Sequence, residues 1–262
     1  MRTRRFELLR PAEIVSERDR CPAIYMPIAP LEWHGPHMPL GTDPVWAHTV
    51  GLRAAGMSGG VVLPPLYWGC DQPLEPDIKA SIGLDPNQRI VGVDFPHNTL
   101  KSHYCAEEVF GLMVRERLDW LLANGYEVVA IINGHGGANQ VATTQRLAEE
   151  YTATRRLTVI CGWPSPVDER GELTWGHATS EEAAMWMIVQ PDSLDLGELP
   201  PEGEPLHCSE YAVIDYGTFN GHPTPDHTAR NDPRTEASVE YGNQKLNLAA
   251  AQLAARVAQA LM

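Results

Sequence analysis

One short segment of the sequence concentrates side chains that can bind divalent metal ions. The stretch LEWHGPHMPLGTDP, residues 31–44, holds one glutamate, two histidines and one aspartate. Mixed carboxylate and imidazole ligands suit Zn²⁺, Mn²⁺ or Fe²⁺, whereas a thiolate-rich set would indicate a structural zinc site. Glu32, His34 and Asp43 are therefore candidate ligands, and His37 is expected to support the site or the fold.

Two later segments contain further candidates. His135 lies in a glycine-rich turn within the sequence IINGHGGANQ. His177 and Glu182 lie in the sequence GHATSEEAAMW, where Glu182 begins a short helical pattern. A carboxylate such as Asp43 can bridge two ions that together activate one water, and catalysis would then need only a proton donor and a shaped pocket.

Each candidate also has a purely structural explanation. Asp43 precedes Pro44 and could cap the helix that follows. Thr179 and Glu182 have the spacing of a capping box, which would occupy the glutamate. His135 could stand in a tight turn whose glycines serve only backbone geometry. The joint placement of the candidates favours the metal site over these explanations.

The turn around His135 could alternatively cradle the phosphates of a nucleotide, because it lies between an expected strand and an expected helix. Asn139 stands where the third glycine of the dinucleotide fingerprint belongs, and the next strand ends without an acidic residue for a ribose. The P-loop pattern and the nucleophilic G-x-S-x-G turn are absent from the sequence. A nucleotide site is therefore disfavoured.

Alternating strands and helices predict an α/β fold with a mostly parallel sheet between helices. The candidate ligands follow the carboxyl ends of two expected strands, where open α/β sheets bind ligands. Two segments rich in proline and glycine, residues 67–102 and 191–234, are long for idle loops, and such loops usually have a function. The expected strands are residues 23–29, 60–66, 127–133 and 157–163, and the expected helices are 44–56, 104–125, 138–154 and 235–261.

The composition narrows the class of protein. With 262 residues, 43% hydrophobic and 21% charged, the chain suits one globular domain spanning residues 1–262. A formal net charge of −14 disfavours nucleic acid and anionic membranes as partners and favours a small molecule or another protein. No apolar stretch suits a membrane span or a signal peptide. Five separated cysteines without a C-x-x-C pair indicate reduced thiols and a cytoplasmic location.

The sequence resembles the creatininase family of metal-dependent amidohydrolases. The resemblance implies a three-layer α/β/α sandwich, two divalent ions per chain and, commonly, a homohexamer. Zinc is the first expectation for the ions, with manganese or iron as alternatives. Four segments in the family's order carry the resemblance: E-x-H-G-P-H-x-P-L-G-T-D from Glu32 to Asp43, N-G-H-G-G at 133–137, H-A-x-x-x-E from His177 to Glu182, and DPRTEASVEYG at 232–242.

The same resemblance assigns roles residue by residue. It implies that Asp43 bridges the two ions, that Glu182 is a fifth ligand and that His177 is the proton donor near the substrate. The other implied ligands are Glu32, His34 and His135.

Several departures from the family pattern weaken an assignment to creatinine while leaving the metal ligands in place. Gly137 stands where the enzyme that gives the family its name has a glutamate. Ala183 and Ala184 replace a Thr-Ser pair whose hydroxyls could orient the Glu182 carboxylate. Thr179 replaces a usual glycine, and the F-P-G-T-I-S run after PPLYWG is missing.

These observations predict hydrolysis of the C–N bond of a small, cyclic amide, with aromatic pocket walls from Trp68, Trp163 and Trp175. The same chemistry could instead cleave a C–C bond of a cyclic ketone such as an oxidised inositol. The acidic loop around Asp71, with Glu75 and Asp77, could then bind sugar-like hydroxyls. Outside catalysis, the chain could be a metal-binding scaffold subunit.

Overall fold

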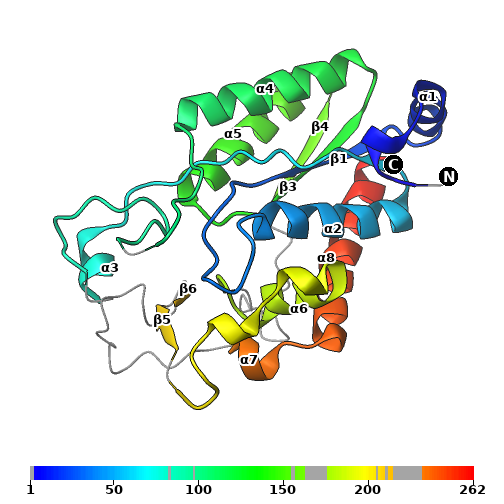
Figure 1. The fold of residues 1–262 in the computed structure, drawn as a ribbon. Helices are drawn as coiled ribbons and strands as arrows, with labels where there is room; N and C mark the ends of the chain where they lie inside the picture. Colours follow the sequence, from blue (N-terminus) through cyan, green and yellow to red (C-terminus); the bar gives the residue numbers. More distant parts are fainter. Residues whose placement is uncertain are drawn as a thin grey trace.

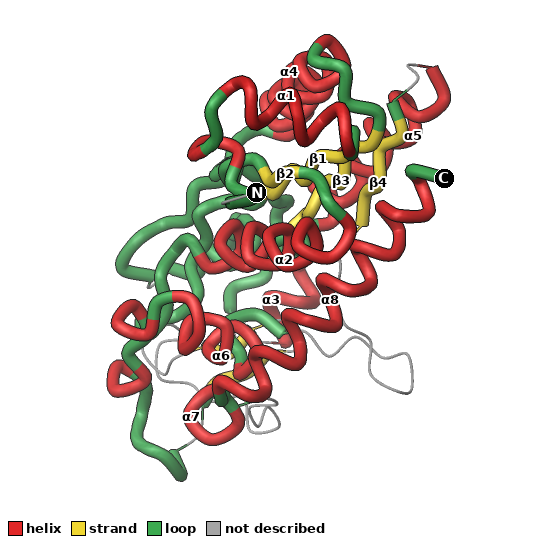
Figure 2. The backbone as a smooth tube through the Cα atoms, turned by 90° about the vertical axis from the view of Figure 1, so that its right-hand side faces the viewer, coloured by secondary structure: helices red, strands yellow, loops and turns green. Residues whose placement is uncertain are grey.

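The computed structural model contains a four-stranded sheet in which every strand runs parallel to its neighbours, in the order β2-β1-β3-β4 (Figures 1 and 2). The strands are β1 (Ala23–Ile28), β2 (Val61–Val62), β3 (Val128–Asn133) and β4 (Thr158–Gly162). The structure describes residues 3–81, 84–96, 98–154, 157–162, 176–204, 206–209, 212–214 and 232–262.

Helices cover both faces of this sheet, which confirms the predicted three-layer α/β/α sandwich (Figures 1 and 2). One layer contains α2 (Thr42–Ser58), α6 (Ser180–Val189) and α8 (Val239–Ala260). The other contains α4 (Glu107–Ala123) and α5 (Ala138–Thr154), with α1 (Pro11–Arg20) beside them.

Alternating side chains of the central strands serve the two layers. Tyr25 packs with α2 and α8, whereas Ile24 and Met26 pack with α4 and α5. Every residue of β1 and β3 is buried, because a parallel strand with helices on both faces has no solvent side. Burial of each large apolar side chain stabilises the fold by about 1.5–3 kcal/mol.

The elements agree with the predicted ones except at a few places. β2 is much shorter than predicted, since Pro64 and Pro65 follow after Leu63 and lack the N–H groups that continue a ladder. The sequence did not predict α1, α3 (Pro76–Ser81) or α7 (Pro233–Glu236). Shorter elements are the 3₁₀ turns at Phe6–Leu8, Pro191–Ser193 and Leu196–Glu198, and an antiparallel pair of β5 (His207–Ser209) with β6 (Ala212–Ile214).

No described helix is long and apolar enough to cross a membrane. The cysteines whose side chains are described, Cys21, Cys70, Cys105 and Cys161, are free thiols.

The register of the two central strands brings the candidate segments together. Ile28 at the end of β1 pairs with Asn133 at the end of β3. The loop leading into α2 and the turn leading into α5 therefore leave the sheet side by side at its carboxyl edge, where the sequence predicted a ligand site.

Candidate metal centre

The loop after β1 holds Glu32 and His34 in fixed orientations. The backbone N–H of Glu32 donates to the carbonyl of Leu40, which closes the loop. His34 Nδ1 lies 3.0 Å from the carbonyl oxygen of Glu32, and a carbonyl can only accept, so Nδ1 carries a hydrogen. His34 Nε2 then points inward at the carboxylates, in a ring with no exposed surface.

Asp43 lies between the two candidate histidines. Its Oδ1 is 3.0 Å from His34 Nε2, and its Oδ2 is 3.4 Å from His135 Nδ1. The alternative prediction that Asp43 caps the helix is wrong: α2 begins at Thr42 with Gly41 as its N-cap, and Asp43 lies in the first turn. The helix supplies the favourable end of its dipole to this carboxylate rather than a capping position.

The turn after β3 presents His135 to the same point. Its backbone N–H donates to the Asn133 side chain at 3.2 Å, and its Nδ1 lies 3.4 Å from Glu32 Oε2. Gly134 is required here, because a Cβ at that position would lie 2.4 Å from the Asp43 carbonyl oxygen. The absence of a side chain at Gly134 lets the turn approach α2 closely.

Glu182 contributes a third carboxylate from α6, in the same helical layer as α2. Its Oε1 lies 3.5 Å from His34 Nε2, and its Oε2 accepts from the backbone N–H of Ala178 at 2.6 Å. The predicted capping box does not form, because the N-cap Thr179 makes no side-chain cap bond. Ala178 adopts a left-handed backbone with φ 58°, an arrangement that non-glycine residues adopt only where surroundings hold them.

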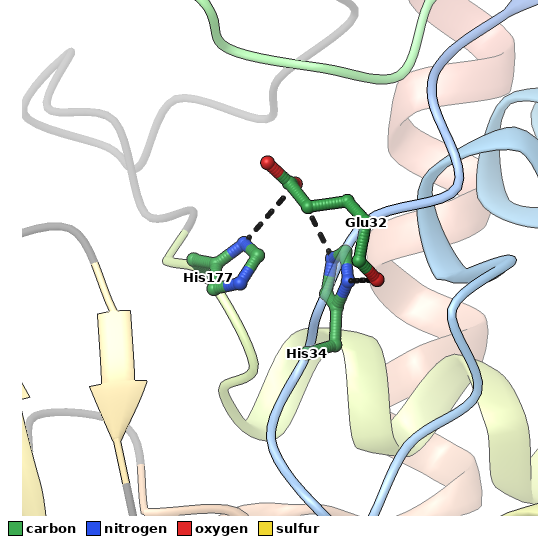
Figure 3. Close-up of side chains that lie close together, drawn as sticks. All are labelled: Glu32, His34 and His177. Carbon is green, nitrogen blue, oxygen red and sulfur yellow. Dashed lines mark hydrogen bonds and ion pairs between the residues drawn. The ribbon is translucent and has the colours of Figure 1, made fainter. Parts of the chain in front are cut away.

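His177 lies beside the centre, with its ring centroid 4.0 Å from that of His34. Figure 3 shows the Glu32 carboxylate facing both His177 and His34, and His177 Nδ1 is 3.5 Å from Glu32 Oε2. His177 Nε2 donates to the carbonyl of Trp33 at 2.6 Å. The lone pair of Nδ1 is therefore directed at the centre.

The carboxylates and imidazoles shift one another's pKa values. Burial alone would raise the pKa of Asp43, but His34 and His135 outweigh it and lower the pKa to about 2. Burial alone would lower the pKa of His34, but the carboxylates of Glu182 and Asp43 raise it well above its usual value. Burial and the neighbouring His34 lower the pKa of His177. The centre thus concentrates negative charge, which protonated histidines offset. A metal ion would compete with these protons for the same nitrogen and oxygen atoms.

The candidate ligands form two triads that share Asp43. In one, Glu32 and His135 join Asp43; in the other, His34 and Glu182 do so. Within each triad the ligand atoms lie within 4.8 Å of one another, and all these residues are buried. Asp43 Oδ2 has no hydrogen-bond partner among the described residues, although such a buried oxygen normally has one. This donor set fits two divalent cations.

The sequence matches the creatininase family, described as creatinine amidohydrolase, over residues 7–257. The chain belongs to the creatininase family. No curated protein matches it.

Solved creatininase structures have the same fold. One described as creatinine amidohydrolase (creatininase) has a TM-score of 0.70 at 20% identity, covering 100% of this chain and 99% of that one. A creatininase mutant described as Zn-Zn type has the same TM-score, identity and coverage. A third, described as creatininase Mn, has a TM-score of 0.68 at 18% identity and covers 99% of both chains.

Two residues that lie beside this creatininase-family centre were not predicted from the sequence motifs. Tyr104, expected inside a helix, lies in the preceding loop, and its hydroxyl donates to Glu32 Oε1. Asp71, considered only for hydroxyl binding, has its Oδ2 3.2 Å from His135 Nε2. No regular spacing links either residue to the ligand motifs. Asp71 lies in the long loop predicted at residues 67–102, whereas no signal in the sequence pointed to Tyr104.

The remaining predictions concern His37 and the three tryptophans expected to wall the pocket. His37 is buried at 2% exposure with neither ring nitrogen hydrogen-bonded to a described residue, and burial lowers its pKa to about 4. Trp68 makes an edge-on contact with His103, with ring centroids 5.1 Å apart. Trp163 and Trp175 lie outside the described residues.

Proposed function

We propose that this protein is a two-metal hydrolase that cleaves the C–N bond of a small, cyclic amide. The observation that carries the proposal is the pair of triads sharing Asp43, which gathers three carboxylates and two imidazoles from three remote segments. In the described part of the chain no lysine or arginine forms an ion pair with these carboxylates. Such a cluster is costly unless cations complete it.

Each triad would hold one ion, with Asp43 between them. Divalent ions bound there would supply an activated water and a polarised substrate carbonyl. We propose zinc first, with manganese or iron as alternatives, because nitrogen and oxygen donors suit all three. The Zn-Zn and Mn descriptions of similar structures support the same choice.

His177 would move the proton. Its lowered pKa keeps the imidazole neutral near pH 7, and Nδ1 is free to accept because Nε2 donates to Trp33. It would take a proton at Nδ1 and deliver it to the leaving nitrogen of the amide. A group with a pKa near or below the working pH suits this shuttle.

The amide is preferred over the cyclic ketone on two grounds. The matched family is described as creatinine amidohydrolase, which names a C–N cleavage. Asp71, which would have bound the hydroxyls of an oxidised inositol, instead faces His135. Loss of that carboxylate leaves the loop with fewer groups to recognise a polyhydroxyl substrate.

The experiment combines metal analysis with a substrate panel. We expect about two ions per chain in protein purified with added Zn²⁺ or Mn²⁺, and we expect chelation to abolish turnover without unfolding the protein. Lactams, creatinine, formamides and keto-cyclitols, followed by mass spectrometry, would identify the bond that breaks. A protein devoid of metal would overturn the proposal and favour a scaffold subunit, and turnover of keto-cyclitols alone would favour C–C cleavage.

We also propose a cytoplasmic homohexamer that binds neither nucleic acid nor membranes. The family resemblance supports the hexamer, and the net charge of −14 supports the absence of polyanionic partners. Light scattering on the purified protein would test the hexamer, and a monomer at micromolar concentration would contradict it.

A further inference from the structure

We infer that Asp71 is a positioning residue that fixes the ring of His135 and thereby sets the affinity of one of the two ions. The inference rests on the proposed two-metal centre and adds a residue outside both triads. Its ground is the contact between the Asp71 carboxylate and the outer nitrogen of a buried candidate ligand.

The two nitrogens of His135 face two different sets of carboxylates. Nδ1 lies 3.4 Å from both Glu32 Oε2 and Asp43 Oδ2, whereas Nε2 lies 3.2 Å from Asp71 Oδ2. Nε2 makes no hydrogen bond to a described residue, so the carboxylate 3.2 Å away is its nearest polar contact of opposite charge. A neutral imidazole carries one hydrogen, and we infer that the Asp71 carboxylate favours its placement on Nε2. Nδ1 is then left with its lone pair facing the triad. A carboxylate behind a ligating histidine fixes its tautomer and orientation and makes it a better ligand.

A buried hydrogen-bond network holds Asp71 and His135 at a constant separation. The Asn133 side-chain oxygen accepts from the His135 backbone N–H at 3.2 Å and from Gln140 Nε2 at 2.7 Å. Gln140 Oε1 in turn accepts from the backbone N–H of Cys70 at 2.9 Å, the residue immediately before Asp71. Asn133, Gln140 and Cys70 are all at most 2% exposed. Hydrogen bonds of the Asn133 and Gln140 side-chain amides therefore connect the turn of His135 to the loop of Asp71.

Two glycines leave the space that the pair occupies. A Cβ at Gly137 would lie 2.5 Å from His135 Nε2, and a Cβ at Gly92 would lie 2.5 Å from Asp71 Oδ2. A side chain at either position would separate the carboxylate from the ring. The absence of side chains at both positions is consistent with a contact built into the fold.

The other candidate histidine ligand, His34, has no comparable carboxylate behind it among the described residues. His34 Nδ1 is held by the backbone carbonyl of Glu32, which no substitution at Asp71 touches. Removal of Asp71 should therefore weaken the ion held by Glu32, Asp43 and His135 and spare the ion held by the His34 triad.

The test measures both Zn²⁺ affinities of the full chain by competition with a chromophoric chelator. We expect Asp71→Ala to weaken one of two ions by about 10- to 100-fold and to leave the other within about twofold. Asp71→Asn should weaken it less, because the amide oxygen still accepts from Nε2–H. Asp77→Asn, which removes the same charge from an exposed position in the first turn of the nearby α3, should match the wild type.

The outcomes separate the inference from the function on which it rests. Wild-type affinities for both ions in Asp71→Ala, or equal weakening of both, would overturn the positioning role while leaving the two-metal proposal intact. A wild-type chain that binds no Zn²⁺ would overturn both. If Asp71→Ala fails to fold, equal affinities in Asp71→Asn and Asp71→Leu would still refute the inference.

Discussion

Two clusters of charge, each built on a buried carboxylate, lie at opposite edges of the same sheet, and their composition differs. At the amino edge, Glu17 is paired with Arg4 and Arg20 and also accepts from the backbone N–H of Gly60 at 2.9 Å. At the carboxyl edge, the ion-pair partners of Glu32, Asp43 and Glu182 among the described residues are all histidines, and one oxygen of Asp43 has no hydrogen-bond partner there.

The difference in charged partners separates a cluster that stabilises the fold from a cluster that we propose binds cations. Arginines are always charged and saturate the Glu17 carboxylate, so this cluster is complete without a ligand. In the carboxyl-edge cluster the positive charge comes from histidines that can lose their protons, and we propose that bound cations complete it. Substitutions at the carboxyl edge should therefore change the number of bound ions, whereas substitutions at the amino edge should change the free energy of unfolding.

The largest effect is expected from Asp43→Ala, which removes the carboxylate shared by both triads. Both ions should be lost together, and turnover should fall by more than about four orders of magnitude. Metal analysis of the purified variant measures the first effect. Retention of both ions at wild-type affinity would show that Asp43 does not bridge them.

The next effect concerns His177→Ala, which should keep both ions and slow turnover by about two to four orders of magnitude. The reason is that His177 is proposed to carry a proton rather than a metal. Steady-state kinetics with parallel metal analysis would check it. Loss of one ion would make His177 a ligand with Glu32 and His34, the third group of neighbouring donors.

At the amino edge, Glu17→Gln should lower the free energy of unfolding by about 2 kcal/mol, because charge-assisted hydrogen bonds to two arginines are lost. The number of bound ions should not change, since Glu17 lies at the other end of the sheet. Urea denaturation and metal analysis together test this. A variant of unchanged stability would mean that the arginines gain nothing from the pair.

The smallest effect is the pH dependence of that same cluster. Burial would raise the pKa of Glu17, but its bonds to Arg20, Gly60 and Arg4 outweigh burial and lower it below 4.5. A carboxylate with a lower pKa in the folded state binds fewer protons there, so its stabilisation is present above about pH 4.5 and is lost as the pH falls through the folded pKa. Comparing acid unfolding of the metal-free wild type and Glu17→Gln should show a shallower loss for the variant.

The sequence located the central strands and the convergence of the ligand segments because both depend on local pattern. Unbroken apolar runs mark β1 and β3, and candidate ligands follow directly on their ends. That Glu32, His34, Asp43, His135 and Glu182 bind metal, and that His177 moves a proton, stays a prediction.

Contacts between distant segments were not predictable in the same way. The prediction of an N-cap at Asp43 failed because α2 begins at Thr42, two residues before the predicted start at Pro44. Asp71 and Tyr104 reach the centre only through the course of a loop whose hydrophobic pattern is irregular. Their place depends on close packing against the turn of His135, which periodicity does not encode.

The position of α6 has a mechanical consequence. Glu182 belongs to this helix, which packs on α8 and is tied to α2 by a 2.9 Å hydrogen bond from Trp186 Nε1 to Thr42 Oγ1, whereas Glu32 belongs to the loop leaving the sheet. Ions bound to Glu182 and Glu32 would cross-link an outer helical layer to the central sheet. Metal binding would then raise the thermal stability of the whole domain, and removal of the metal would weaken the packing of α6 on the rest of the fold.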